Sequence, residues 1–558
     1  MLILVSVVTE SARMNIVQTE CKVFTHLASD SVLAGYARQV YEDYGILLVW
    51  EEKTLKEQLM EYIQANIEQA DLNVATANIM STQVRDIKIG QVQYVEDNGG
   101  ETFIEQILSY MKYAVVKESV NKLMDLYSKN NYQEKSDTTE DMINVEKNSE
   151  ISKIVDDIND ELSNLKNNNI KNQLISEKMR KNFLRKVKKI INKIKLYQIK
   201  RKSYLKSYKE IECVDYMDFN LEILEQIKNK IEKEELMDSS SLEEKWGYIW
   251  KETQEKIKNL KVNVSTEEDK KNQGIYESAK QFLDKGILSM VIDDSSNVSS
   301  ASISDLNLPS KKKIKKEDLP YSAIDKAKVI LYAGMKFGNY THLKSNTDLK
   351  YELEYIIAGK DNDRSNLVAV VEQMTGVRNI ATLAYIIRDK AKMAQLSSIS
   401  ASVATSLGLP FLEPVIKVVL TEAWALAEAV HDVKTLMRGK KIDMTKNSTN
   451  WVTQLNHLIS KKSRGSEKKS AIDYQQFCYL LAIKEKINKI GFRIMDLIQL
   501  NIQKNYNQSF LMRRCFTGFH IKVQYETEPM FASMPWTIDT LGEKIGAYSF
   551  FVESKMKY

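Results

Sequence analysis

The chain has 558 residues, of which 43% are hydrophobic and 28% are charged, an ordinary composition that gives room for about two to four domains. With 80 Lys and Arg residues against 75 Asp and Glu residues, the formal net charge is only +5, which gives no global electrostatic case for a nucleic-acid binder. The 6 prolines and 19 glycines are sparse for this length. Sheet-rich folds need more turn residues, so we predict a helix-dominated α+β fold.

The first stretch of the chain joins an apolar tip to a helical pattern. Residues 1–8 are uncharged and mostly apolar, and the first charges are Glu10 and Arg13. Apolar residues then recur at steps of three and four, at Val17, Cys21, Phe24, Ala28, Val32, Tyr36 and Val40. This spacing predicts one long amphipathic helix through Asp43, ended by Gly45. Residues 1–45 are therefore the first of four predicted segments, an anchor-like helix.

Two interpretations of the tip remain open. A bilayer core requires about 20 apolar residues in helical form, and the uncharged run here is much shorter. Either residues 1–8 are the outer end of a longer membrane anchor encoded upstream of Met1, or they are the buried first turn of a soluble helix. In the first case Glu10 and Arg13 mark the point where the helix leaves the apolar phase, because charges are costly deeper in lipid. By analogy with pilins, Glu10 would alternatively pair with a basic group of a neighbouring subunit.

Residues 46–127 read as a compact α/β unit. A strand-like run, Ile46–Trp50, is followed by a capping box at Thr54–Glu57 and an amphipathic helix. A second strand, Val84–Tyr94, carries Gly90 as a bulge, and a turn at Asp97–Gly100 leads into another helix.

Residues 128–318 are rich in Lys, Glu and Asn, yet helical spacing persists in two places. The apolar positions are Met179, Phe183, Val187, Ile190 and Ile194, and then Ile223, Ile227 and Ile231. Capping boxes at Ser240 and Ser265 indicate further helices. We predict a charged, coiled-coil-like helical insertion with flexible linkers at 128–149 and 293–318. Its basic stretch, 180–195, is interpreted as a solvated face paired with the acidic helix at 222–235.

Residues 319–558 are predicted to form a second α+β body. Alternation over Tyr351–Ile357 predicts a strand that ends at Gly359. Four helices should follow, at 367–375, 381–406, 414–438 and 472–503, with Gly439 just past the third. Two late strands, around Ile521–Tyr525 and Tyr548–Val552, are expected to complete the sheet begun near Trp50.

Chemical motifs are scarce. No phosphate loop, dinucleotide fingerprint, nucleophile elbow or zinc-protease motif occurs, and the cysteines form no C-x-x-C pair. Glu428-x-x-His431 is suggestive of a di-iron ligand pair, but that chemistry requires a second Glu-x-x-His on a facing helix, so we interpret it as a charge pair on a helix surface near Trp424. The acids at Asp361–Asp363 are interpreted as a helix cap rather than a calcium loop. The uncharged stretch at 393–412 is interpreted as a buried helix, because membrane spans are predominantly apolar. We predict no catalytic, cofactor-binding or metal-binding residues and no enzymatic activity.

Short motifs in both ordered bodies carry a family resemblance. They are Glu10–Arg13, Leu33–Tyr36, Glu42–Gly45, Asp97–Gly100, Met111–Tyr113, Tyr351–Lys360, Asn366–Leu367, Trp424, Glu428, Leu436–Lys440, Trp451, Asp473–Tyr474 and Arg493–Asp496. With these the chain resembles an uncharacterised family of Gram-positive cell-surface proteins that is similar to TadE/TadG-type pseudopilins and accompanies Tad (Flp-type) pilus genes. The resemblance implies an N-terminal membrane helix, an extracellular body and no assigned catalytic residues. The short apolar tip departs from that pattern and puts the anchor in question.

The resulting expectation is a non-enzymatic structural or assembly protein of the cell surface, associated with Tad/Flp-type pilus or secretion machinery. Its expected partners are other envelope or pilus-assembly proteins and the membrane, without cofactors and without nucleic acid. The alternative is a soluble intracellular scaffold that binds a partner or nucleic acid through the basic helical insertion. Fractionation of the native gene product and the codons upstream of Met1 separate these two hypotheses.

Overall fold

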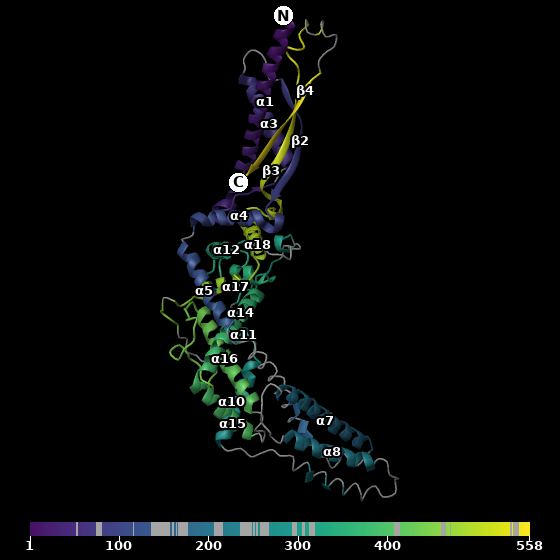
Figure 1. Ribbon diagram of the computed structural model, residues 1–558, viewed down its shortest axis with the longest axis vertical. Coiled ribbons are helices and arrows are strands. Elements are labelled where there is room, and N and C mark those ends of the chain that lie inside the picture. Colours follow the sequence, from purple (N-terminus) through teal and green to yellow (C-terminus); the bar gives the residue numbers. More distant parts are fainter. Residues whose placement is uncertain are drawn as a thin grey trace. The chain divides into compact units, whose positions relative to one another are not determined.

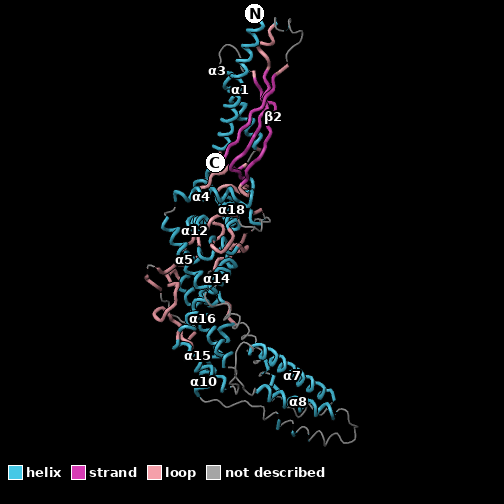
Figure 2. The backbone as a smooth tube through the Cα atoms, viewed as in Figure 1, coloured by secondary structure: helices cyan, strands magenta, loops and turns pink. Residues whose placement is uncertain are grey.

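The structure is a computed structural model that describes residues 1–51, 54–73, 81–114, 117–135, 177–205, 216–234, 267–292, 298–303, 307–311, 319–406, 413–458, 465–468, 470–535, 538 and 546–558, with parts of 154–165 and 248–256. Its described residues form mostly helices and one four-stranded sheet (Figure 2). The predicted helix-dominated α+β class is therefore confirmed.

The chain divides into two compact units. Unit 1 comprises Met1–Ser128, Ser296–Val370 and Tyr474–Tyr558, and unit 2 comprises Lys129–Ser295 and Val371–Asp473. The predicted segment 319–558 is thus divided between the units, and a strand near its end pairs with two strands from the first hundred residues of the chain.

One strand near the end of the chain pairs with each of the other three strands in the sheet of unit 1. β3 (Cys515–Thr527) pairs antiparallel with β1 (Val49–Trp50), β2 (Thr82–Tyr94) and β4 (Tyr548–Lys557). The expectation that the late strands complete the sheet begun near Trp50 is confirmed. The ladder between β2 and β3 shifts register between Ile89 and Val92, which places the predicted bulge at Gly90.

Two helices pack together beside this sheet (Figure 1). α1 (Leu2–Ala34) contacts α3 (Leu55–Asn73), β3 and β4. The predicted apolar stripe of α1 is buried from Val17 to Val32 in one hydrophobic cluster with β3 residues such as Ile521 and Val523. The predicted capping box of α3 is also present, with reciprocal hydrogen bonds between Thr54 and Glu57 at 3.1 and 3.4 Å.

The first helix is shorter than predicted. α1 ends at Ala34, and a separate helix, α2 (Arg38–Tyr44), follows before Gly45, whose φ is +72°. The break occurs because Ala37 is extended and its N–H donates to the Leu48 carbonyl oxygen at 2.8 Å instead of continuing the helical ladder. The predicted stop at Gly45 is correct, and the uninterrupted helix is wrong.

Unit 1 has further helices among its described residues. It contains α4 (Asp97–Ala114), the start of α5 (Lys117–Lys135), α12 (Ala323–Lys336), α13 (Glu352–Ala358), the start of α14 (Asp363–Arg388), α17 (Tyr474–Ala482) and α18 (Ile487–Asn505), with short 3₁₀ turns at Pro309–Lys311 and Met512–Arg514. The helix predicted at 472–503 is thus two helices, separated at residues 483–486.

The strand predicted at Tyr351–Ile357 is wrong, because these residues form α13. Alternating acids normally mark a solvent face, but Glu352 and Glu354 are 1% and 0% exposed. Glu352 accepts from the Gly338 N–H at 2.7 Å, and Glu354 accepts from the Tyr474 hydroxyl at 2.7 Å. The alternation therefore comes from buried, hydrogen-bonded glutamates on a helix and has no relation to a sheet.

Unit 2 contains a helical pair formed by α7 (Glu177–Leu205) and α8 (Tyr216–Glu234). The apolar positions predicted for these helices are buried where the structure describes them. Lys188 pairs with Glu232 and Lys195 with Glu225, both at 2.6 Å, so the pairing of the basic face with the acidic helix is confirmed. The capping box at 240–243, the start of the box at Ser265 and most of the two linkers lie outside the described residues.

The other helices of unit 2 are α10 (Glu267–Leu283), α11 (Ile287–Val291), the rest of α14, α15 (Lys390–Ser406) and α16 (Glu413–Met437). The predicted break between residues 375 and 381 is wrong, since α14 continues to Arg388. The break falls at Asp389, whose carboxylate accepts the N–H groups of Ala391 and Lys392 and caps α15. Among the described helices, none combines the length and apolar content that crossing a bilayer requires.

Candidate functional site

The apolar tip of the chain is exposed. Along the first turns of α1, five aliphatic side chains are between 51% and 69% exposed: Leu2, Leu4, Val5, Val7 and Val8. The same helix is packed on the sheet further along, so the tip is a helical extension of a buried element in which these five aliphatic side chains stay exposed (Figure 1). The interpretation of residues 1–8 as a buried first turn is therefore wrong within this chain.

Glu10 and Arg13, the two predicted assembly residues, lie at the inner border of that tip and are buried. Arg13 Nη2 lies 2.6 Å from Glu10 Oε1 and donates to the Glu528 carbonyl oxygen at 2.7 Å. Glu10 Oε2 accepts the N–H groups of Phe531 at 2.7 Å and Met530 at 3.2 Å. The pair fastens the loop that follows β3 to α1.

The electrostatics agree with this role. Burial opposes ionisation of Glu10, but Arg13 and the backbone N–H of Phe531 outweigh it and lower the pKa of the carboxyl below its ordinary value. Both carboxylate oxygens of Glu10 accept hydrogen bonds from groups of this chain. Glu10 therefore stabilises the contact between α1 and the loop after β3, directly beside the tip.

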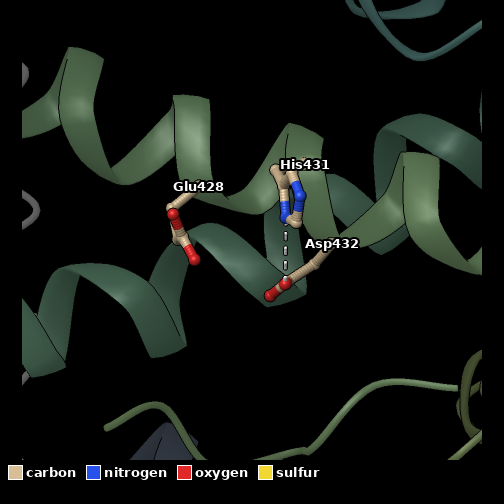
Figure 3. A group of neighbouring side chains, drawn as sticks. All are labelled: Glu428, His431 and Asp432. Carbon is tan, nitrogen blue, oxygen red and sulfur yellow. Dashed lines mark ion pairs between the residues drawn. The ribbon is translucent and has the colours of Figure 1, made fainter. Parts of the chain in front are cut away.

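Glu428, His431 and Asp432 form a second cluster, on α16 in unit 2 (Figure 3). Glu428 is 0% exposed, so the predicted charge pair on the helix surface is wrong: the group is buried. One ligand atom from each of the three residues lies within 4.8 Å of the others. That grouping has the donor types of a metal site.

Two cations already hold these carboxylates. Lys446 Nζ lies 2.7 Å from Glu428 Oε1 and 2.8 Å from Asp432 Oδ1, and Arg378 donates to Asp432 Oδ2 at 2.6 and 3.0 Å. Burial disfavours the Asp432 carboxylate, but Arg378 and Lys446 together lower its pKa strongly. A metal ion would have to displace the Lys446 ammonium group, so the donor set does not fit a resident metal.

The network has a structural role. Glu428 also accepts the backbone N–H groups of Val452 and Thr453, at 2.8 to 3.2 Å, and Arg378 donates to the Met444 carbonyl oxygen at 2.7 Å. The charges thus join α14 and α16 to the irregular segment after Gly439. Sequence reasoning found Glu428 and His431 but missed Arg378 and Lys446, because Lys446 lies in a segment without periodicity.

No curated protein and no solved structure matches the chain. A protein-family model does match part of it, from α10 to α18 and through the whole of β3, a span that includes the charged network but not the apolar tip. In these residues, 265–527, the chain is similar to a family of unknown function, DUF5702.

Proposed function

We propose that this chain is a non-enzymatic structural or assembly protein of the cell surface, held at the membrane by the exposed tip of α1. The observation that carries the proposal is the apolar tip, Leu2 to Val8, which extends from a helix whose next turns are buried against the sheet. Exposing such an apolar patch to water costs free energy, and monomeric soluble proteins rarely do so. The patch is therefore best explained as a surface that contacts an apolar phase.

The arrangement of unit 1 supports a pseudopilin-like role. A long N-terminal helix lies along an antiparallel sheet, with the helix start projecting as an apolar tip. This is the plan of pilin-like subunits, in which the helix start sits in the membrane before assembly. Association with Tad/Flp-type pilus or secretion machinery, and a body on the outer side of the membrane, rest on that fold-level analogy and on the sequence resemblance.

The area of the tip sets the expected strength of membrane contact. Fully burying a Val or Leu side chain is worth about 1.5–3 kcal/mol, and each of the five side chains has more than half of its surface left to bury. The tip therefore contributes roughly 5 kcal/mol, comparable to a single acyl chain, which gives reversible membrane binding. Residues 1–8 by themselves thus predict weak, measurable partitioning.

Flotation with lipid vesicles tests the proposal. The chain should rise with phosphatidylglycerol-containing vesicles, and Leu4→Glu combined with Val8→Glu should lower the partition constant at least tenfold. Leu27→Glu is the matched control, because Leu27 is also exposed on α1, at 47%, but lies beyond the tip. Equal flotation of the double variant and the control would refute membrane contact through the tip.

The alternative, a scaffold that binds nucleic acid through the basic insertion, receives less support. Besides the α7–α8 pairs, Lys189 and Lys193 lie 2.8 and 2.9 Å from Glu161. Acidic side chains of the same unit therefore neutralise much of the positive face that a phosphate backbone would need.

A further inference from the structure

Unit 2 contains a cavity of about 580 Å³ that the proposed function does not use. Its walls come from α10, α15, α16 and residues 451–456. Among the residues that the structure describes, no acidic side chain lines it, whereas Lys271 and Lys392 both do. Its volume is in the range that holds a small ligand.

Lys392 is the unusual group of this cavity. Its ammonium nitrogen lies 4.3 Å from the ring centroid of Trp424 and 4.2 Å from that of Trp451. No carboxylate of the described residues is within ion-pairing distance of it, and the nearby Asp389 carboxylate instead accepts the Tyr385 hydroxyl at 2.9 Å. Partial burial lowers the pKa of Lys392, against the longer-range attraction of Asp389 and Glu428. The two indole rings hold a cation in place and leave it without an anionic partner.

The polar wall supplies groups of another kind. Four side-chain amides line the cavity: Asn272, Gln395, Gln454 and Asn456. Thr453 also lines it, and its hydroxyl is buried without a hydrogen-bond partner among the described residues. A buried hydroxyl in that condition is costly, but it is covered by the protein, so the four amides are the polar groups of this wall that a ligand can reach.

From this combination we propose that the cavity binds an acidic saccharide of one or two sugar rings. Lys392 and Lys271 would hold its carboxylate or phosphate group. The amides would bond to its hydroxyl groups, and the partly exposed Trp451 side chain would contact the apolar face of a sugar ring. The cavity belongs to unit 2 and the apolar tip to unit 1. Saccharide binding at this site is therefore independent of the proposed membrane contact, and each is tested by its own experiment.

Titration of the full chain with defined probes tests the assignment, using tryptophan fluorescence and calorimetry. The probes are digalacturonate for a carboxylate, glucose 6-phosphate for a phosphate, inorganic phosphate for charge alone and maltose for a neutral sugar. We expect at least one acidic sugar to bind at least tenfold more tightly than maltose and inorganic phosphate. Tighter binding of digalacturonate would identify a carboxylate as the charged group of the ligand, and tighter binding of glucose 6-phosphate would identify a phosphate.

Variants identify the residues that bind. Lys392→Gln should weaken binding of the acidic sugar at least tenfold, and Lys392→Arg should retain most of it. Lys390→Gln is the matched control, because Lys390 is exposed on the same helix and does not line the cavity. Lys271→Gln, at an exposed position, should weaken binding about threefold without any effect on folding. Equal binding of maltose, absence of binding by every probe, or wild-type affinity in Lys392→Gln would overturn the proposal.

Discussion

Replacing Lys446 by methionine should destabilise unit 2 by about 3–5 kcal/mol, the usual cost of removing one partner from a buried ion pair. The Lys446 side chain is 2% exposed and contacts two carboxylates, at 2.7 and 2.8 Å. At these distances and an effective dielectric constant of about 20, each attraction is worth about 6 kcal/mol before desolvation. Methionine fills a similar volume but leaves Glu428 and Asp432 buried with only Arg378 to neutralise them.

Urea unfolding followed by tryptophan fluorescence and far-ultraviolet circular dichroism measures the change. The double variant Lys446→Met with Glu428→Gln restores the charge balance, so it should recover about half of the lost stability. Lys441→Met, an exposed site in the same segment, is the control and should stay within about 0.5 kcal/mol of the wild type. A loss below about 1 kcal/mol in Lys446→Met, or a double variant less stable than the single one, would refute the assignment of a charge-balanced network.

Three further predictions concern pH, the loop beside the tip and metals. Burial raises the pKa of Glu352 and of Glu354 to about 7, above the ordinary 4.5, so their contribution to stability is fully present below pH 4.5 and is lost as the pH rises through 7. The loss amounts to about 3 kcal/mol per group, and Glu354→Gln should flatten the pH profile of the unfolding free energy between pH 5 and 8. Arg13→Met leaves the buried Glu10 carboxylate without its cation, so the free energy of unfolding should fall by about 3 kcal/mol. Hydrogen exchange of the Phe531 backbone amide, which bonds to Glu10, should accelerate, and unchanged exchange would contradict the role assigned to Arg13. Added Zn²⁺ should not raise the melting temperature of the wild type, because Lys446 occupies the place between the carboxylates; a rise of several degrees would indicate a metal site.

Periodic helices were the part of the fold that the sequence predicted best. Phe183, Val187 and Ile190 recur at the helical period and are buried, as are Leu59 and Ile63, because each helix has one apolar face. The strands near Ile521 and Tyr548 were predicted from alternation, which reports burial of one sheet face. Those signals depend only on neighbours along the chain.

The wrong predictions arose where tertiary contacts decide. Tyr351–Ile357 alternates, but all its residues are buried, so alternation carried no information about a sheet. The break after α1 depends on a hydrogen bond from Ala37 to Leu48, between residues whose pairing no periodicity indicates.

The candidate site was predicted only in part. Glu10, Arg13, Glu428 and His431 were recognised by residue type and spacing. Their partners were not, because Glu528–Ala532 and Lys446 approach them only after folding. Trp424 and Trp451 were noted without their cation, since Lys392 comes from a different helix.

The central claim is that the tip of α1 enters an apolar phase. An environment-sensitive fluorophore on Val5→Cys, in a Cys213→Ser background, measures this directly, because the other cysteines are buried. On addition of phosphatidylglycerol-containing vesicles, we expect a blue-shifted, stronger emission from the label at position 5 and no change from a label on Leu27→Cys. If the emission at position 5 stays as red-shifted as that at position 27, the tip of α1 remains in water and does not contact the membrane.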